Sequence, residues 1–244
     1  MFSAVQHLTS AHPPSLLITA VYPLQKHAMQ VLPAIVPLCL SPPLERLVLS
    51  SPEAAHREAG SSDPPLDAAQ LRPLAALQQL PALELIGLNS LGPGVARALR
   101  QLTGLTYLRL AREAAGSEHA SFGSGRCADV FRAASALTRL QELSVTGSTG
   151  SSVVELPEEM SRLTGLRRLQ VREISIMQTS RVLAALTALT ALDLLRDGAL
   201  HIHGPTTQNP LPPGIHALSS LRELRVTCNY QPVPAPWPRL SVTV

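Results

Sequence analysis

The chain has 244 residues, of which 15% are charged, and its formal net charge at pH 7 is +3. This length is ample for one domain with a sizeable apolar core. Acidic and basic residues are interspersed, which disfavours a general electrostatic binder of DNA or RNA. The cysteines are far apart and odd in number, and no N-x-S/T acceptor occurs, so we expect a reducing, cytoplasmic setting for Cys39, Cys127 and Cys228.

The first part of the chain is apolar but is interrupted by prolines and by Lys26. Its longest uninterrupted apolar stretch, 16–24, falls short of the roughly 20 residues that a membrane-spanning helix needs. No positive charge precedes this stretch, as a secretory signal would require. We therefore predict no membrane span and expect residues 1–31 to form a degenerate first repeat or a cap.

One short sequence pattern, the repeated phrase, then occurs six times. Its apolar residues are spaced by three, by three again, and then by two. A spacing of three is typical of helical turns and a spacing of two is typical of strands. The pattern predicts short parallel strands in one curved sheet near 85–88, 107–110, 142–145, 168–171, 191–194 and 223–226. The six quartets are Leu80-Leu83-Ile86-Leu88, Leu102-Leu105-Leu108-Leu110, Leu137-Leu140-Leu143-Val145, Leu163-Leu166-Leu169-Val171, Leu186-Leu189-Leu192-Leu194 and Leu218-Leu221-Leu224-Val226.

Looser copies flank the six strict ones. One lies upstream at Leu44, Leu47 and Leu49, and a partial one lies at Leu240 and Val242. Prolines crowd the second copy, so an edge strand is the most that it can form. We accordingly assign the repeats to residues 32–229 and a Pro-rich C-terminal segment, with room for a partial last repeat, to 230–244.

Helices and loops are expected between the strands. Apolar residues recur at three or four in 94–102, 128–137, 157–163 and 180–187, which predicts short helices there. Polar, small and Gly- or Pro-marked residues predict loops at 50–66, 112–127 and 196–210.

The repeated phrase resembles the leucine-rich repeat pattern L-x-x-L-x-L-x-x-N/C-x-L over roughly residues 30–229. The last strict copy matches it through Asn229, whereas the other copies carry Leu91, Glu113, Ser148, Ile174 and Asp197 at the Asn position. The resemblance is to an intracellular type with degenerate, irregular repeats. It implies an α/β solenoid with a curved parallel sheet on the concave side and short helices or irregular turns on the convex side.

Sequence motifs for chemistry are weak. His201 and His203, with His216 nearby in sequence, could hold a metal, but no carboxylate or Cys follows at ligand spacing, so a polar loop is favoured. Gly92-Pro93-Gly94 lacks the third glycine or following Lys of a phosphate loop, and no nucleophile elbow occurs. We therefore predict a non-enzymatic protein with no catalytic residues, metal, cofactor or small-molecule substrate.

The strand pattern also predicts a binding surface. Residues between the core-facing positions of each strand should form three rows on the concave side, in which Leu85 and Gly87 represent the 80–88 copy. Tyr and Arg are enriched at binding hot spots, and the arginines favour a protein partner with an acidic patch. The candidate partner-binding residues are Arg46, Tyr107, Arg109, Glu142, Arg168, Gln170, Arg172, Asp193, Glu223 and Arg225.

These features favour a protein–protein interaction scaffold that binds its partner on the concave face. Two other hypotheses stay open from the sequence. In the first, the chain is a recognition-domain piece of a larger signalling or immune-type receptor. In the second, it is a structural component of a cytoskeletal or axonemal assembly. The second of these places the protein on the cytoskeleton or in the axoneme of a cilium.

Overall fold

The computed structural model describes residues 3–5, 15–19, 44–50, 71–86, 95–111, 124–147, 153–172, 175–177, 180–194, 215–226 and 241–243. Ten strands within these ranges form one sheet in the order β1-β2-β3-β4-β5-β6-β8-β10-β11-β12. The β1–β2 pair is antiparallel, and the other pairs of this sheet are parallel. The strands are β1 (Ser3–Val5), β2 (Ser15–Thr19), β3 (Arg46–Ser50), β4 (Ala82–Ile86), β5 (Tyr107–Ala111), β6 (Glu142–Thr146), β8 (Arg168–Arg172), β10 (Ala191–Leu194), β11 (Glu223–Val226) and β12 (Ser241–Thr243).

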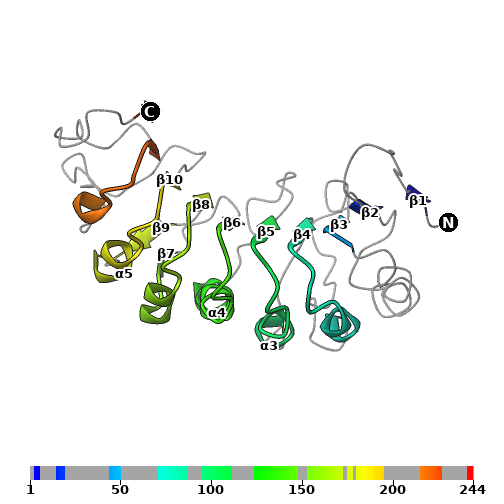
Figure 1. The fold of residues 1–244 in the computed structure, drawn as a ribbon. Coiled ribbons are helices and arrows are strands. Elements are labelled where there is room, and N and C mark those ends of the chain that lie inside the picture. The colour runs from blue at the N-terminus through cyan, green and yellow to red at the C-terminus, as the bar shows by residue number, and fades with distance from the viewer. Residues whose placement is uncertain are drawn as a thin grey trace, which may run out of the picture.

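Short helices form a second layer behind the sheet, and the two layers together curve into an arc with the sheet on its inner side (Figure 1). The helical segments are η3 (Arg72–Ala76), α3 (Val95–Leu99), α4 (Ser124–Ala134), η4 (Glu158–Arg162), α5 (Ser180–Ala185) and η5 (Ile215–Ala217). The α/β repeat solenoid expected from the sequence is confirmed. No helix in the part of the chain that the structure describes is long and apolar enough to cross a membrane.

The four predicted helices are present with shifted ends, whereas η3 and η5 were not predicted. Our predicted loop 112–127 is wrong at its end, because α4 already begins at Ser124. The buried residues Val130 and Phe131 anchor this helix to the core, and once a turn is anchored, adding further turns is favourable. A small parallel pair, β7 (Val153–Glu155) and β9 (Ser175–Met177), was also not predicted. The predicted loop 50–66 is wrong at its first residue, because Ser50 belongs to β3. The rest of that loop and the predicted loop 196–210 lie outside the described residues.

Two successive turns explain the spacing of three in each repeat. The Leu105 N–H donates to the Leu102 carbonyl over 3.1 Å, and the Leu102 N–H donates to the Leu99 carbonyl over 3.0 Å. Bonds of this i to i+3 kind place residues three apart on the same side of the chain, here toward the core. Two successive bonds of this kind also occur in the other repeats, where the second bond is donated by the N–H of Leu80, Leu140, Leu166, Leu189 or Leu221.

Neighbouring repeats are joined where each turn enters its strand. The Thr106 carbonyl accepts the N–H groups of both Gln141 and Glu142, and the Gln141 carbonyl accepts those of Arg167 and Arg168. The same double acceptance recurs at the junctions to β5, β10 and β11. Each of these repeats is therefore hydrogen-bonded to the next one, as expected for a solenoid whose stability comes from nearest-neighbour interfaces.

The predicted register of the first strict repeat is wrong by three residues. β4 spans Ala82–Ile86 rather than 85–88, and Leu83 and Leu85 align with Leu108 and Leu110 of β5. Leu85 is fully buried instead of facing the concave side. The phrase LQQLPALEL, which begins at Leu77, fits the same spacing with leucine at all four positions. Two registers were therefore available, and packing against the neighbouring strands selects the earlier one.

The core positions predicted for the other five strict copies are confirmed wherever the structure describes the burial of the side chain, which leaves Val226 untested. Leu108, Leu143, Leu169 and Leu192 are each 0–1% exposed. The other strict copies form strands that follow their predicted ranges to within one residue, and the looser copies form β3 and the edge strand β12. Each repeat has one residue at the Asn position of the leucine-rich repeat pattern. All six lie outside the described residues, namely Leu91, Glu113, Ser148, Ile174, Asp197 and Asn229.

Candidate functional site

The strand register places all ten predicted surface residues on the same face of the sheet. A first row runs from Arg46 through Tyr107, Glu142, Arg168 and Ala191 to Glu223. A central row, two residues later in each strand, contains Glu84, Arg109, Ser144, Gln170, Asp193 and Arg225, and a third row contains Thr146 and Arg172. Parallel strands lie about 4.8 Å apart, so neighbours within a row are within side-chain contact.

One polar cluster lies on β3, β4 and β5, and we call it the Glu84 cluster. Glu84 is 2% exposed as a residue, and its carboxylate lies between two arginines. Arg46 donates to Glu84 Oε1, and Arg109 Nη1 lies 3.4 Å from Glu84 Oε2. The Arg46 guanidinium also lies 5.7 Å from the centroid of the Tyr107 ring, a cation–π distance. The buried charge is thus compensated by groups from the strands on both sides.

The residues of the Glu84 cluster affect the pKa of the Tyr107 phenol. Burial raises the pKa of its phenol above the ordinary value of 10.0, and the Glu84 carboxylate raises it further. The positive charges of Arg109 and Arg46 oppose the increase. Tyr107 is therefore a neutral hydrogen-bonding group at physiological pH.

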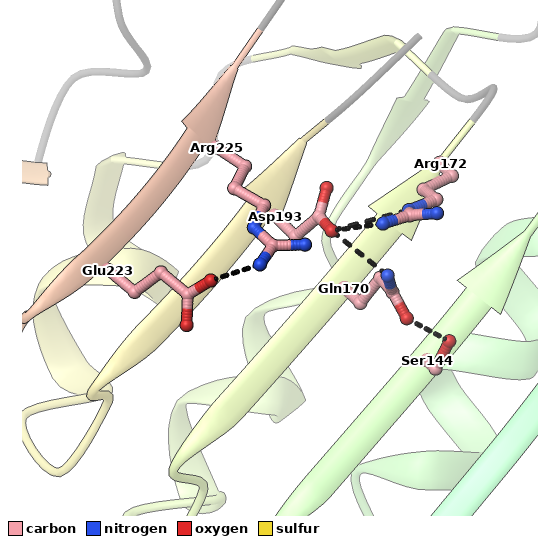
Figure 2. Close-up of polar contacts among 6 residues, drawn as sticks. All are labelled: Ser144, Gln170, Arg172, Asp193, Glu223 and Arg225. Carbon is pink, nitrogen blue, oxygen red and sulfur yellow. Dashed lines mark hydrogen bonds and ion pairs between the residues drawn. The ribbon is translucent and has the colours of Figure 1, made fainter. Parts of the chain in front are cut away.

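A second cluster, the Asp193 cluster, crosses β6, β8 and β10 (Figure 2). Ser144 Oγ donates to Gln170 Oε1 over 2.7 Å, and Gln170 Nε2 donates to Asp193 Oδ2 over 2.9 Å. The same carboxylate oxygen accepts from Arg172, whose Nη2 lies 2.7 Å away. Gln170 and Arg172 both belong to β8, so these two donors reach Asp193 from the same side of β10.

A small hollow lies beside this cluster, over Ala191, and we call it the Ala191 hollow. Its volume is about 50 Å³, and it is lined by Arg168 and Gln170 of β8, Ala191, Leu192 and Asp193 of β10, and Glu223 and Arg225 of β11. On its β11 side, Arg225 Nη2 lies 2.7 Å from Glu223 Oε1. Arg225 Nε is buried and makes no hydrogen bond within the described part of the chain.

The structure does not bring every predicted residue into these contacts. Arg168 is exposed and Glu142 is half-buried. Neither forms a hydrogen bond or an ion pair through its side chain with another residue that the structure describes. Arg168 therefore has no ion-pair partner among the described residues, although Glu142 is its neighbour in the first row.

Sequence reasoning missed Glu84, the most buried charged residue among those described on the concave face. The signal was present, because the LQQLPALEL register places Glu84 between two core leucines and beside Arg109. The error in register replaced it with Gly87, which lies outside the described residues.

The described residues leave most of the weak chemical motifs untested. Among the described residues, no three His, Cys, Asp or Glu side chains gather closely enough to hold a metal ion. His216 lies exposed on η5, whereas His201, His203, Gly92-Pro93-Gly94, Cys39 and Cys228 lie outside the described residues. Cys127 lies on the first turn of α4.

Comparison with known proteins finds similarity only to solved structures. No protein-family model matches the sequence, and no curated protein matches it either. A leucine-rich repeat protein of Leptospira interrogans is 19% identical, with a TM-score of 0.42, over 75% of this chain and 43% of that one. This chain thus spans less than half of the length of that protein.

Proposed function

We propose that the chain is a non-enzymatic scaffold that binds a protein partner on the concave face of its sheet. The observation that supports this most is the continuity of the polar surface. Charged and amide side chains occupy neighbouring positions on successive strands from β3 to β11. Such a surface offers an extended set of donors and acceptors, as the concave faces of solenoids do.

The internal bonds of this surface also favour binding. Gln170, Arg172 and Asp193 are already fixed by one another in the free protein. Side chains held in one geometry lose little conformational entropy when a partner docks. Tyr107 adds a rigid, partly exposed aromatic group of the kind that is enriched at hot spots.

The two other hypotheses use the same surface in different assemblies. A recognition domain of a larger receptor and a component of a cytoskeletal or axonemal structure would both hold a partner on the concave face. The identity of the bound protein separates them, and it also tests the proposed cytoplasmic location.

The test is site-specific photo-crosslinking in an extract of the source cells. A photoreactive phenylalanine analogue replaces Tyr107 on the concave face or, as a control, Arg181 on the exposed side of α5. We expect a protein to be crosslinked at position 107 and not at position 181. Crosslinking from position 181 alone would place the binding site on the convex side.

The affinity of the crosslinked protein is then measured with charge-reversed variants. Arg168→Glu is the better choice over Arg172→Glu, because Arg172 holds Asp193 and its reversal would disturb the fold. We expect Arg168→Glu to weaken binding, most strongly at low salt, and the matched Arg181→Glu control to leave it unchanged. Equal affinity of the two variants would contradict the proposal.

A further inference from the structure

The two polar clusters are built on the same arrangement of residues on three neighbouring strands. β3, β4 and β5 begin Arg-Leu-Val, Ala-Leu-Glu and Tyr-Leu-Arg, and β8, β10 and β11 begin Arg-Leu-Gln, Ala-Leu-Asp and Glu-Leu-Arg. In both sets the first row has an arginine, then an alanine. In both sets the central row has a carboxylate followed by an arginine.

The space over the alanine differs between the two sets. Ala82 lies between Arg46 and Tyr107 in the first row, and these two side chains contact each other across it. Ala191 lies between Arg168 and Glu223, and the space over it is the hollow of about 50 Å³. One water occupies about 30 Å³ in the liquid, so this hollow has room for a group of a few heavy atoms.

The bonding of the two arginines beside the carboxylate differs as well. Arg46 and Arg109 both turn to Glu84 in the first set. In the second set Arg225 pairs with Glu223 of its own strand, and Asp193 accepts from Gln170 and Arg172. Arg168, the counterpart of Arg46, is left without a described acceptor, and the buried Nε of Arg225 has none either.

The charged residues that line the hollow balance, because Arg168 and Arg225 are positive and Asp193 and Glu223 are negative. Arg225 pairs with Glu223, and Asp193 pairs with Arg172, which lies outside the lining, so Arg168 is the charged residue of the lining without a described ion-pair partner. One further carboxylate would pair with Arg168 and would find guanidinium donors on both sides of the hollow. Guanidinium–carboxylate bonds of this kind are about twice as strong as neutral hydrogen bonds.

We infer that the Ala191 hollow is the subsite for one aspartate or glutamate side chain of the protein partner, which binds between Arg168 and Arg225. This inference rests on the proposed function and sharpens it. The partner is anchored by a single acidic side chain at the β8–β11 end of the face, whereas at the β3–β5 end Arg46 and Tyr107 contact each other over the equivalent alanine.

The test uses the whole 244-residue chain and a defined probe. The protein is labelled with ¹⁵N, and the Nε–Hε signals of its arginines are followed by NMR while the peptide acetyl-Gly-Ser-Glu-Ser-Gly-amide is added. We expect saturable shifts of the Arg168 and Arg225 signals, assigned with Arg168→Lys and Arg225→Lys. The same peptide with Gln in place of Glu should leave both signals in position.

A filled hollow provides the decisive variant. Ala191→Leu keeps both arginines and occupies the space between them, and Ala82→Leu makes the same change at the equivalent position of β4. We expect Ala191→Leu to lower the affinity for the Glu peptide about tenfold or more, whereas Ala82→Leu should retain it. Retained far-ultraviolet circular dichroism shows that both variants fold.

Several results would overturn the inference. Equal binding of the Glu and Gln peptides, or equal losses in Ala191→Leu and Ala82→Leu, would show that the hollow is not the carboxylate site. Acetate that shifts the same signals with the affinity of the Glu peptide would make the hollow a general anion site.

The crosslinked partner separates this inference from the proposed function. If the partner binds Ala191→Leu as tightly as the parent but binds Arg168→Glu weakly, the subsite is wrong and the concave scaffold stands. If neither variant changes its affinity, the concave scaffold itself is wrong.

Discussion

The two ends of the concave face carry nearly the same residues and use them differently. At the β3–β5 end, a buried carboxylate is held by arginines from both sides, and an aromatic ring covers the alanine. At the β8–β11 end, the residue equivalent to Tyr107 is Glu223, which pairs with Arg225. The exchange of an aromatic for an acidic residue in the first row, together with Gln170 in place of Val48 in the central row, accompanies a hollow over Ala191 and an arginine without a described ion-pair partner.

The contrast teaches how a repeat protein differentiates its surface without changing its core. Leu108 and Leu192 are equally buried under the two ends. The backbone of one repeat is bonded to the next in the same way at both places. Differences between the ends are therefore confined to residues that alternate outward on the strands, where a substitution alters bonding without disturbing the stack.

The largest expected effect tests whether the two cores are equivalent. Leu108→Ala and Leu192→Ala each remove a fully buried side chain, and each should lower the free energy of unfolding by about 2–5 kcal/mol. Urea unfolding followed by circular dichroism measures the loss. An unfolding curve of either variant that coincides with that of the parent would show that the two cores differ and would refute the strand register at that repeat.

A smaller effect should separate the two first-row arginines. Arg46→Ala leaves the buried Glu84 with only the longer contact to Arg109, so we expect a loss of about 1–2 kcal/mol, reduced by the exposure of Arg46. Arg168→Ala removes no described bond of the side chain and should change stability by no more than about 0.5 kcal/mol. Equal losses of stability in the two variants, measured by urea unfolding, would mean that the Arg168 side chain is bonded in solution. The two first-row arginines would then not differ.

Two glycines of the identical phrase Leu-Thr-Gly-Leu extend the comparison to the turns. A Cβ at Gly104 would lie 2.4 Å from the Gln78 carbonyl oxygen, whereas a Cβ at Gly165 would meet nothing within 4 Å. Gly104→Ala should therefore destabilise by about 1–3 kcal/mol, because the preceding repeat must shift. Gly165→Ala should stabilise by about 0.4–1 kcal/mol through the unfolded chain. Thermal melts that rank the two variants the other way would show that the turns pack differently.

The smallest expected effect is a pH dependence of the free energy of unfolding that arises from Tyr107 at the β3–β5 end. The pKa of Tyr107 is raised in the folded protein, so its contribution to stability is complete below pH 10 and is lost as the pH rises through the folded pKa. Stability measured by urea unfolding should therefore fall less steeply above pH 10 in Tyr107→Phe than in the parent.

Glu84→Gln provides a second check on the same group. The Glu84 charge is the second cause of the raised pKa, so its removal should lower the pKa of Tyr107 in an ultraviolet titration of tyrosinate. An unchanged titration would show that burial alone accounts for the shift and that the carboxylate does not act on the ring.

The sequence by itself determined the repeated strand, its parallel pairing and the buried leucines. A spacing of three followed by two can be satisfied only by a turn that enters a strand, and such a unit buries its apolar side by stacking. All ten predicted surface residues lie on one face for the same reason, because alternate residues of a strand point to opposite sides.

Only the tertiary structure decided which of two registers the residues from Leu77 to Leu88 adopt. Both satisfy the spacing, and the choice depends on how Leu83 and Leu85 pack beside Leu108 and Leu110. The sequence also could not assign partners to the arginines. Long side chains reach several carboxylates on adjacent strands, so only their positions in space show that Arg46 is paired with Glu84 while Arg168 has no described partner.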